Sequence, residues 1–145
     1  AKALAPSMIK RRATGSIVAL GGLASMTGQP LRAHVVASKT GLYGLIKSLA
    51  LELGPYGIRA NLIAVGHIDT ARRNPEWYPE GGGVPYMGEK GAGSDGSALG
   101  TAGGGTPLGR LGNSQEVANV ALFLASDESS YVTGDRIICA GGRYM

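Results

Sequence analysis

Few side chains in this sequence combine a reactive type with a spacing that suggests chemistry. The clearest is Lys39, in the triplet Ala-Ser-Lys, which lies in a long apolar pattern of helical period over residues 34–53. A buried lysine without a partner is energetically expensive, so its ammonium group either reaches water or contacts a ligand. Residues four apart share a helical face, which places Val35 one turn before Lys39. A valine can neither donate nor accept a proton.

The remaining reactive groups form no recognisable catalytic set. The two histidines, His34 and His67, and the one thiol, Cys139, have no spacing that resembles a metal site, so we expect none. The sequence has no Gly-x-Ser-x-Gly motif, so a hydrolase would lack its nucleophile elbow.

The composition limits the classes of protein to consider. The chain has 145 residues, of which 43% are hydrophobic and 17% charged, which is typical of one globular domain. A lone cysteine fits a reducing, cytoplasmic compartment, and no apolar run is long enough for a membrane span. The net charge of +4 comes from scattered basic residues, and aromatic residues make up 6%. We therefore expect neither a nucleic acid nor a membrane as a partner.

The elements that must position these residues alternate along the chain. Residues 1–15 have the pattern of the end of a helix, and residues 16–20 that of a buried strand. The helix over 34–53 stops at Gly-Pro-Tyr-Gly, and residues 58–65 are the next strand. Ser114 is the expected N-cap of another amphipathic helix, and a last short strand spans 136–140. This order predicts parallel α/β layers with about three strands.

A glycine-rich stretch over residues 80–109 separates the second strand from the last helix. It is too long for an ordinary connection, so it is either a functional loop or a disordered one. Gly91, Gly93 and Gly96 spell Gly-x-Gly-x-x-Gly, but no strand precedes them and no helix follows. We reject this match as a dinucleotide fingerprint.

Three stretches in the right order carry a family resemblance: SIVALGG, AHVVASKTGLYGLIKSLALELGPYGIRANLIAVGHIDT and GRLGNSQEVANVALFLASDESSYVTGDRIICAGG. Together they resemble the second half of a short-chain dehydrogenase/reductase. The resemblance implies one partial Rossmann-like domain over residues 1–145, a doubly wound parallel sheet whose N-terminal half is missing. Residues 71–109 then correspond to the family's substrate loop.

The same resemblance implies the positions of the site. Lys39 matches the lysine that holds the nicotinamide ribose and lowers the pKa of a catalytic tyrosine. Val35 stands where that tyrosine belongs, and Gly22, 13 positions earlier, stands where the family has its serine. Ile68 resembles the residue whose backbone meets the carboxamide, and Thr70 the residue that touches the pyrophosphate.

Other side chains could be considered as replacements for the missing groups. His34 is rotated about 100° from Val35 around the helix, and Tyr43 lies one turn beyond Lys39. We interpret Tyr43 as a packing residue, and Ser25 and Thr27 as ordinary loop hydroxyls.

These observations leave three hypotheses open. The chain is part of an NAD- or NADP-dependent oxidoreductase acting on an unknown carbonyl or alcohol, inactive or very weak as this fragment. Alternatively, it is a non-catalytic binding or scaffold module, or a degenerate truncated product. The resemblance also implies a homo-oligomer through the helix over 34–53.

Overall fold

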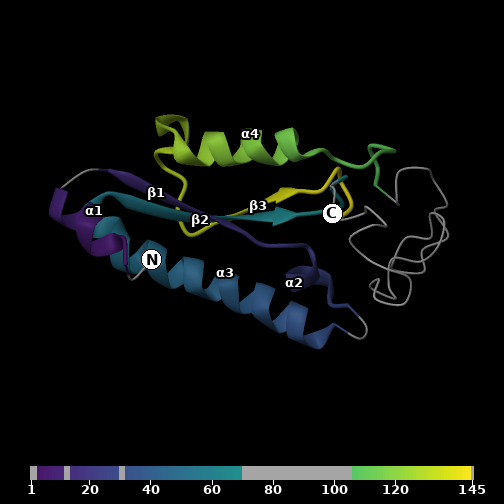
Figure 1. Ribbon diagram of the computed structural model, residues 1–145, viewed down its shortest axis with the longest axis horizontal. Helices are drawn as coiled ribbons and strands as arrows, with labels where there is room; N and C mark the ends of the chain where they lie inside the picture. The colour runs from purple at the N-terminus through teal and green to yellow at the C-terminus, as the bar shows by residue number, and fades with distance from the viewer. Residues whose placement is uncertain (1–2, 12–13, 30–31, 70–105, 145) are drawn as a thin grey trace.

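The computed structural model describes residues 3–11, 14–29, 32–69 and 106–144 (Figure 1). Three parallel strands form one sheet in the order β1-β2-β3: β1 (Gly15–Leu20), β2 (Ile58–Val65) and β3 (Arg136–Cys139). This confirms the predicted partial Rossmann-like α/β fold with about three strands.

Helices cover both faces of the sheet. The long α3 (Ala33–Leu53) and the short α2 (Ala24–Thr27) lie on one face, and α4 (Ser114–Ala125) lies on the other (Figure 1). A further helix, α1 (Ala5–Arg11), precedes β1, and two 3-10 turns, η1 (Gly54–Tyr56) and η4 (Asp127–Ser129), follow α3 and α4. No helix in these described ranges is long and apolar enough to span a bilayer.

The core forms where α3 packs on the central strand. β2 is mostly apolar and buried at six of its eight positions, as expected for a strand covered on both faces. Ala60 and Ala64, on either side of Leu62, have small side chains, so the apolar face of α3 can pack close to β2. The cluster comprises Leu23, Ile46, Ala50, Ala60, Leu62, Ala64 and Ala140.

A buried amide fastens β2 to the turn that leads into β3. Asn61 is fully buried, and its Nδ2 donates to the carbonyl of Val132 at 2.7 Å. Its Oδ1 accepts from the backbone N–H of Asp135 at 3.1 Å. Both polar ends of the amide are therefore satisfied inside the fold, as a buried amide requires.

Several predicted boundaries need correction. The N-cap of α4 is Asn113 and not Ser114, because the Asn113 side chain accepts from the N–H of Glu116. The first helix ends at Arg11, four residues before the expected Gly15, which is already in β1. The last strand ends at Cys139. Sequence periodicity also missed α2, which is only one turn long.

Candidate functional site

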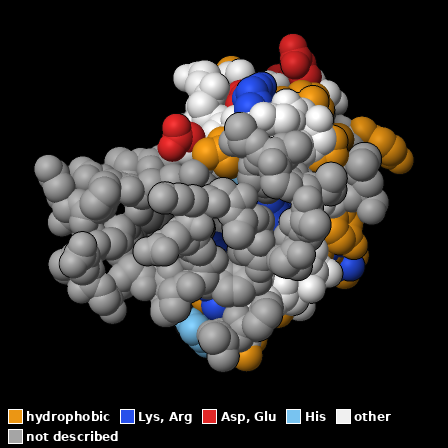
Figure 2. Space-filling model, turned by 90° about the vertical axis from the view of Figure 1, so that its right-hand side faces the viewer, with side chains coloured by type: hydrophobic (Ala, Val, Ile, Leu, Met, Phe, Trp, Pro, Cys, Tyr) orange, Lys and Arg blue, Asp and Glu red, His pale blue; other side chains and the backbone are white. Residues whose placement is uncertain are grey.

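The carboxyl ends of the three strands meet at one edge of the sheet, on the right of Figure 1. Backbone hydrogen bonds continue past the strands: Gly21 N–H donates to Ile63 O at 2.8 Å and Gly66 N–H donates to Cys139 O at 2.9 Å. Figure 2 views the molecule from this end, with a few acidic side chains and a basic one along its upper margin on the α4 side. Open α/β sheets bind their ligands at such an edge.

Lys39 belongs to this edge. It is half-buried, and its Nζ donates to the carbonyl of Leu20, the last residue of β1, at 3.2 Å. Val35, one turn earlier on α3, is also half-buried. The structure therefore places a cation at the end of β1, with an apolar side chain one helical turn before it.

Gly22 follows β1 on the same side of the sheet as α2. A Cβ built on Gly22 would meet nothing closer than Val65 O at 3.9 Å, which is ordinary contact. Gly21 differs, since its Cβ would lie 2.7 Å from Leu62 Cδ2. Packing therefore explains the glycine at 21 but not the glycine at 22, where a small side chain has room.

Gly66, directly after β2, is required by a close approach of two backbones. Its Cβ would lie 2.7 Å from the Cα of Ala140, which follows β3. Because that neighbour is main chain, it cannot move away as the end of a flexible side chain could.

Ile68 forms an isolated parallel bridge with Gly112. The bridge uses the carbonyl of His67, which accepts from Gly112 N–H at 3.0 Å, and the N–H of Asp69, which donates to Gly112 O at 2.8 Å. It therefore does not use the backbone N–H of Ile68 itself. Thr70, the other residue predicted to contact a cofactor, lies outside the described residues, as does most of the segment over 71–109.

An ion pair beside this bridge was missed at the sequence level. Arg110 donates from Nη2 and Nη1 to the two carboxylate oxygens of Glu116, at 2.6 and 2.9 Å. Glu116 also accepts from the backbone N–H of Asn113 at 2.8 Å, which completes a capping box on α4. The Arg110 hydrogen bond, followed by that from Asn113, lowers the pKa of Glu116 to about 2. The sequence pattern that indicates this capping box is Asn-x-x-Glu before an apolar run, at Asn113 and Glu116.

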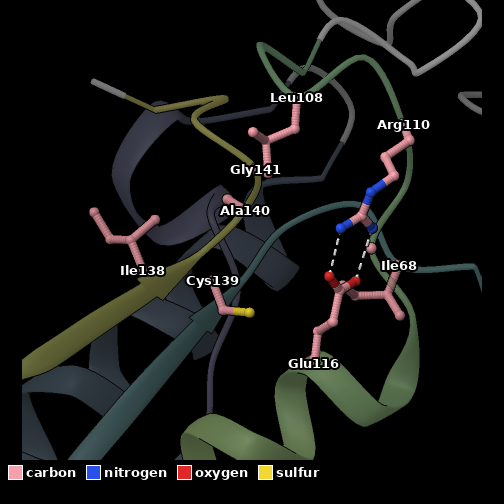
Figure 3. A pocket seen from close by; sticks show the side chains of 9 residues that line it. Ile68, Leu108, Arg110, Glu116, Ile138, Cys139, Ala140 and Gly141 are labelled. Carbon is pink, nitrogen blue, oxygen red and sulfur yellow. Dashed lines mark hydrogen bonds and ion pairs between the residues drawn. The ribbon is translucent and has the colours of Figure 1, made fainter.

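We call the Ile68–Gly112 bridge and the Arg110–Glu116 ion pair together the clasp. Beside it lies an open pocket of about 190 Å³, lined by Ile68, Leu108, Arg110, Gly112, Glu116, Ile138, Cys139, Ala140 and Gly141 (Figure 3). The Cys139 side chain points toward Glu116, whereas Ile138 points to the other side of β3. Burial, together with the Glu116 carboxylate, raises the pKa of the Cys139 thiol and keeps it protonated at neutral pH.

Of the side chains considered as replacements for a tyrosine or serine, His34 is exposed, and Ser25, Thr27 and Tyr43 make contacts within their own part of the fold. Ser25 Oγ donates to Gly22 O at 2.8 Å, and Thr27 Oγ1 donates to Leu23 O at 3.3 Å, so both act as local turn hydroxyls. Tyr43 packs against the core as predicted. His67 Nδ1 lies 3.0 Å from Arg143 Nη1. In the described parts of the chain, no group of three histidine, cysteine or acidic residues could hold a metal ion.

A protein-family model described as enoyl-(acyl carrier protein) reductase matches residues 1–77 and 82–143. The chain belongs to the short-chain dehydrogenase/reductase family. It is similar to the 3-oxoacyl-acyl-carrier-protein reductase FabG of Escherichia coli (strain K12), with 37% identity over 99% of this chain and 51% of the relative. It is also similar to an L-rhamnose 1-dehydrogenase (NAD(P)(+)) of Sphingomonas, with 33% identity over 99% of this chain and 50% of that one.

A solved short-chain dehydrogenase/reductase structure gives the same fold. The 3-oxoacyl-acyl-carrier-protein reductase of Brucella melitensis, determined with bound NAD, has a TM-score of 0.75 and 39% identity. The match covers 99% of this chain and 46% of that chain. This chain thus spans about half the length of the short-chain dehydrogenases/reductases that it matches.

Proposed function

We propose that this chain corresponds to the carboxyl-terminal half of an NAD(P)-dependent short-chain oxidoreductase and that, by itself, it retains a cofactor contact without the family's proton-transfer groups. The observation that carries the proposal is the pairing of Lys39, placed at the end of β1, with Val35 one turn before it. Relatives named for 3-oxoacyl and L-rhamnose substrates suggest a carbonyl or alcohol as the reacting group.

The residues present fit the nicotinamide end of such a cofactor. Lys39 has two further ammonium hydrogens beyond the one donated to Leu20 O, and these can meet ribose hydroxyls. The clasp leaves the backbone N–H of Ile68 available to a carboxamide oxygen. A bound nicotinamide would supply or accept the hydride. Thr70 is proposed as the pyrophosphate contact.

Proton transfer is where this chain departs from the family. Val35 carries only methyl groups, and Gly22 offers no hydroxyl to a reacting oxygen. General acid–base catalysis is worth roughly 10²–10⁴-fold, so its loss leaves very slow reduction. We assign Lys39, which donates one hydrogen bond to Leu20 O, to cofactor contact rather than to proton transfer.

The test is NAD(P)H binding by the purified chain. We expect a saturable change in NADH or NADPH fluorescence, weakened about tenfold in Lys39→Met because a charge-assisted hydrogen bond is lost. Lys10→Met removes an exposed lysine of α1 and serves as the matched control. An unchanged fluorescence at millimolar cofactor would contradict cofactor contact by this chain.

A second candidate, a non-catalytic binding module of short-chain reductase fold, is favoured by Gly22 in particular. The position has room for a side chain and has none, so its glycine is not a packing requirement. NAD(P)H binding without any turnover of a 3-oxoacyl thioester or L-rhamnose would support this candidate over the first.

We also propose that the chain forms a homo-oligomer through α3. The solvent side of this helix carries Gly41 and Gly44, whose added Cβ atoms would meet nothing within 4 Å. Leu45 and Leu51, on the same helix, are 52% and 81% exposed. A second copy of α3 could approach closely where these glycines leave room, on a side that also carries the exposed Ser48 and Glu52.

A further inference from the structure

Two cations share one aromatic ring on the α3 side of the sheet. Lys47 Nζ lies 4.5 Å from the centroid of the Tyr43 ring, and Arg136 Cζ lies 4.6 Å from the same centroid. Tyr43 and Lys47 are one turn apart on α3, whereas Arg136 begins β3. Segments far apart in the sequence therefore meet at this ring. We call Tyr43, Lys47 and Arg136 the cation–ring cluster.

The hydrogen-bonding groups of these two cations have no acceptor among the residues that the structure describes. Other arginines differ: Arg59 donates to the carbonyls of Val132 and Ser126, and Arg110 donates to Glu116. The nearest carboxylate in sequence, Asp135, accepts from the backbone N–H of Arg136 and not from its guanidinium. The guanidinium of Arg136 therefore lies over the Tyr43 ring, and its N–H groups donate to no acceptor within the described residues.

The cluster is also accessible. Tyr43 and Arg136 are half-buried and Lys47 is exposed. Ile138, two residues after Arg136 and hence on the same face of β3, is 40% exposed, so α3 does not cover this strand completely. The cluster is therefore partly open to solvent beside β3.

From these contacts we propose that the cation–ring cluster binds the oxyanion of a small molecule, a phosphate or a carboxylate. An arginine fork matches both groups bidentately, and stacking on Tyr43 fixes its orientation before a ligand arrives. Lys47 adds a second charge beside the same ring. The site lies on the α3 side of β3, apart from the pocket beside Cys139.

The test is an NMR titration of the intact chain at constant ionic strength. Inorganic phosphate is added in one arm and acetate in another, while the Arg136 Nε–H and Tyr43 ring signals are followed. We expect a saturable shift in at least one arm. Saturation by phosphate alone indicates a phosphorylated ligand, and saturation by both indicates that carboxylates are accepted.

Three variants separate the cluster from general electrostatics. Arg136→Lys keeps the charge but loses the fork, and should weaken binding about tenfold. Lys47→Ala, at an exposed position that should not disturb folding, should weaken it similarly. Lys10→Ala removes an equal charge on α1 and should leave binding unchanged. A shift that never saturates in either arm, or equal weakening by Lys10→Ala, would overturn the proposal.

Discussion

The Lys39 side chain crosses from α3 to the end of β1, where a carbonyl at the terminus of the strand accepts from its Nζ. That contact explains how a lysine is accommodated on a largely apolar side of the helix, because the methylene stem packs while the ammonium is hydrogen-bonded. Val35 needs no such arrangement. On one helical face, Lys39 can therefore donate hydrogen bonds, whereas Val35 can only pack.

Introducing at Val35 and Gly22 the tyrosine and serine that the proposed mapping assigns to these positions is the sharpest test at this scale. In the double variant Val35→Tyr/Gly22→Ser, we expect turnover to rise by about 10²-fold or more over the unmodified chain, since an acid–base group is regained. The measurement is NAD(P)H consumption with a 3-oxoacyl thioester.

Val35→Phe/Gly22→Ala provides matched sizes without hydroxyl groups and should leave the rate unchanged. If both double variants behave alike, the mapping of the site onto Val35 and Gly22 is wrong.

At the scale of elements, the segment after β2 passes so close to the segment after β3 that residue 66 has no room for a side chain. Gly66→Ala places a methyl group against the Ala140 backbone and should lower the free energy of unfolding by about 1–3 kcal/mol. Gly22→Ala adds the same group where there is room and should change it by less than about 0.5 kcal/mol. Urea denaturation of both variants gives the comparison, and equal losses would contradict this packing argument.

The ion pair of the clasp makes a pH-dependent contribution to stability. The pKa of Glu116 falls from its ordinary 4.5 to about 2 in the folded chain. A depressed carboxyl pKa stabilises the fold above pH 4.5, and this contribution is lost as the pH falls toward 2. Because both groups are exposed to solvent, we expect the effect to diminish at high salt.

In Glu116→Gln we expect a lower melting temperature at pH 7 than in the parent chain, with the difference shrinking between pH 4.5 and pH 2. Thermal melts across this range provide the measurement. Glu128→Gln, at an exposed position in η4, is the control and should leave the pH dependence intact.

The regular elements could be predicted from the sequence, whereas the contacts between distant segments could not. Periodicity gave β2 with its observed bounds and α3 to within one residue, because their apolar patterns are long. The clasp depends on Gly112 meeting Ile68 across 44 residues of sequence, and no local pattern carries that information. The room at Gly22 likewise depends on Val65, which belongs to another strand.

At the scale of the whole molecule, the solvent side of α3 determines the expected assembly. Leu51→Lys replaces an exposed apolar side chain with a charge on this side of α3, so a dimer or larger species should dissociate to monomers at micromolar concentration. Light scattering coupled to size-exclusion chromatography measures the mass. Tyr131→Lys changes a fully exposed residue away from α3 and should leave the mass unchanged. A monomeric parent chain would contradict the proposed oligomer.

The clasp has a consequence for how this fold tolerates changes in chain length. Because Gly112 is hydrogen-bonded to His67 and Asp69 on either side of Ile68, the register between β2 and α4 is set at that bridge rather than by the number of residues joining them. Doubling the length of a closed loop costs only about 0.6 kcal/mol. The family match is itself interrupted at residues 78–81, within this stretch. We therefore expect a change in the number of residues between Ile68 and Gly112 to leave the pairing of the three strands unaltered.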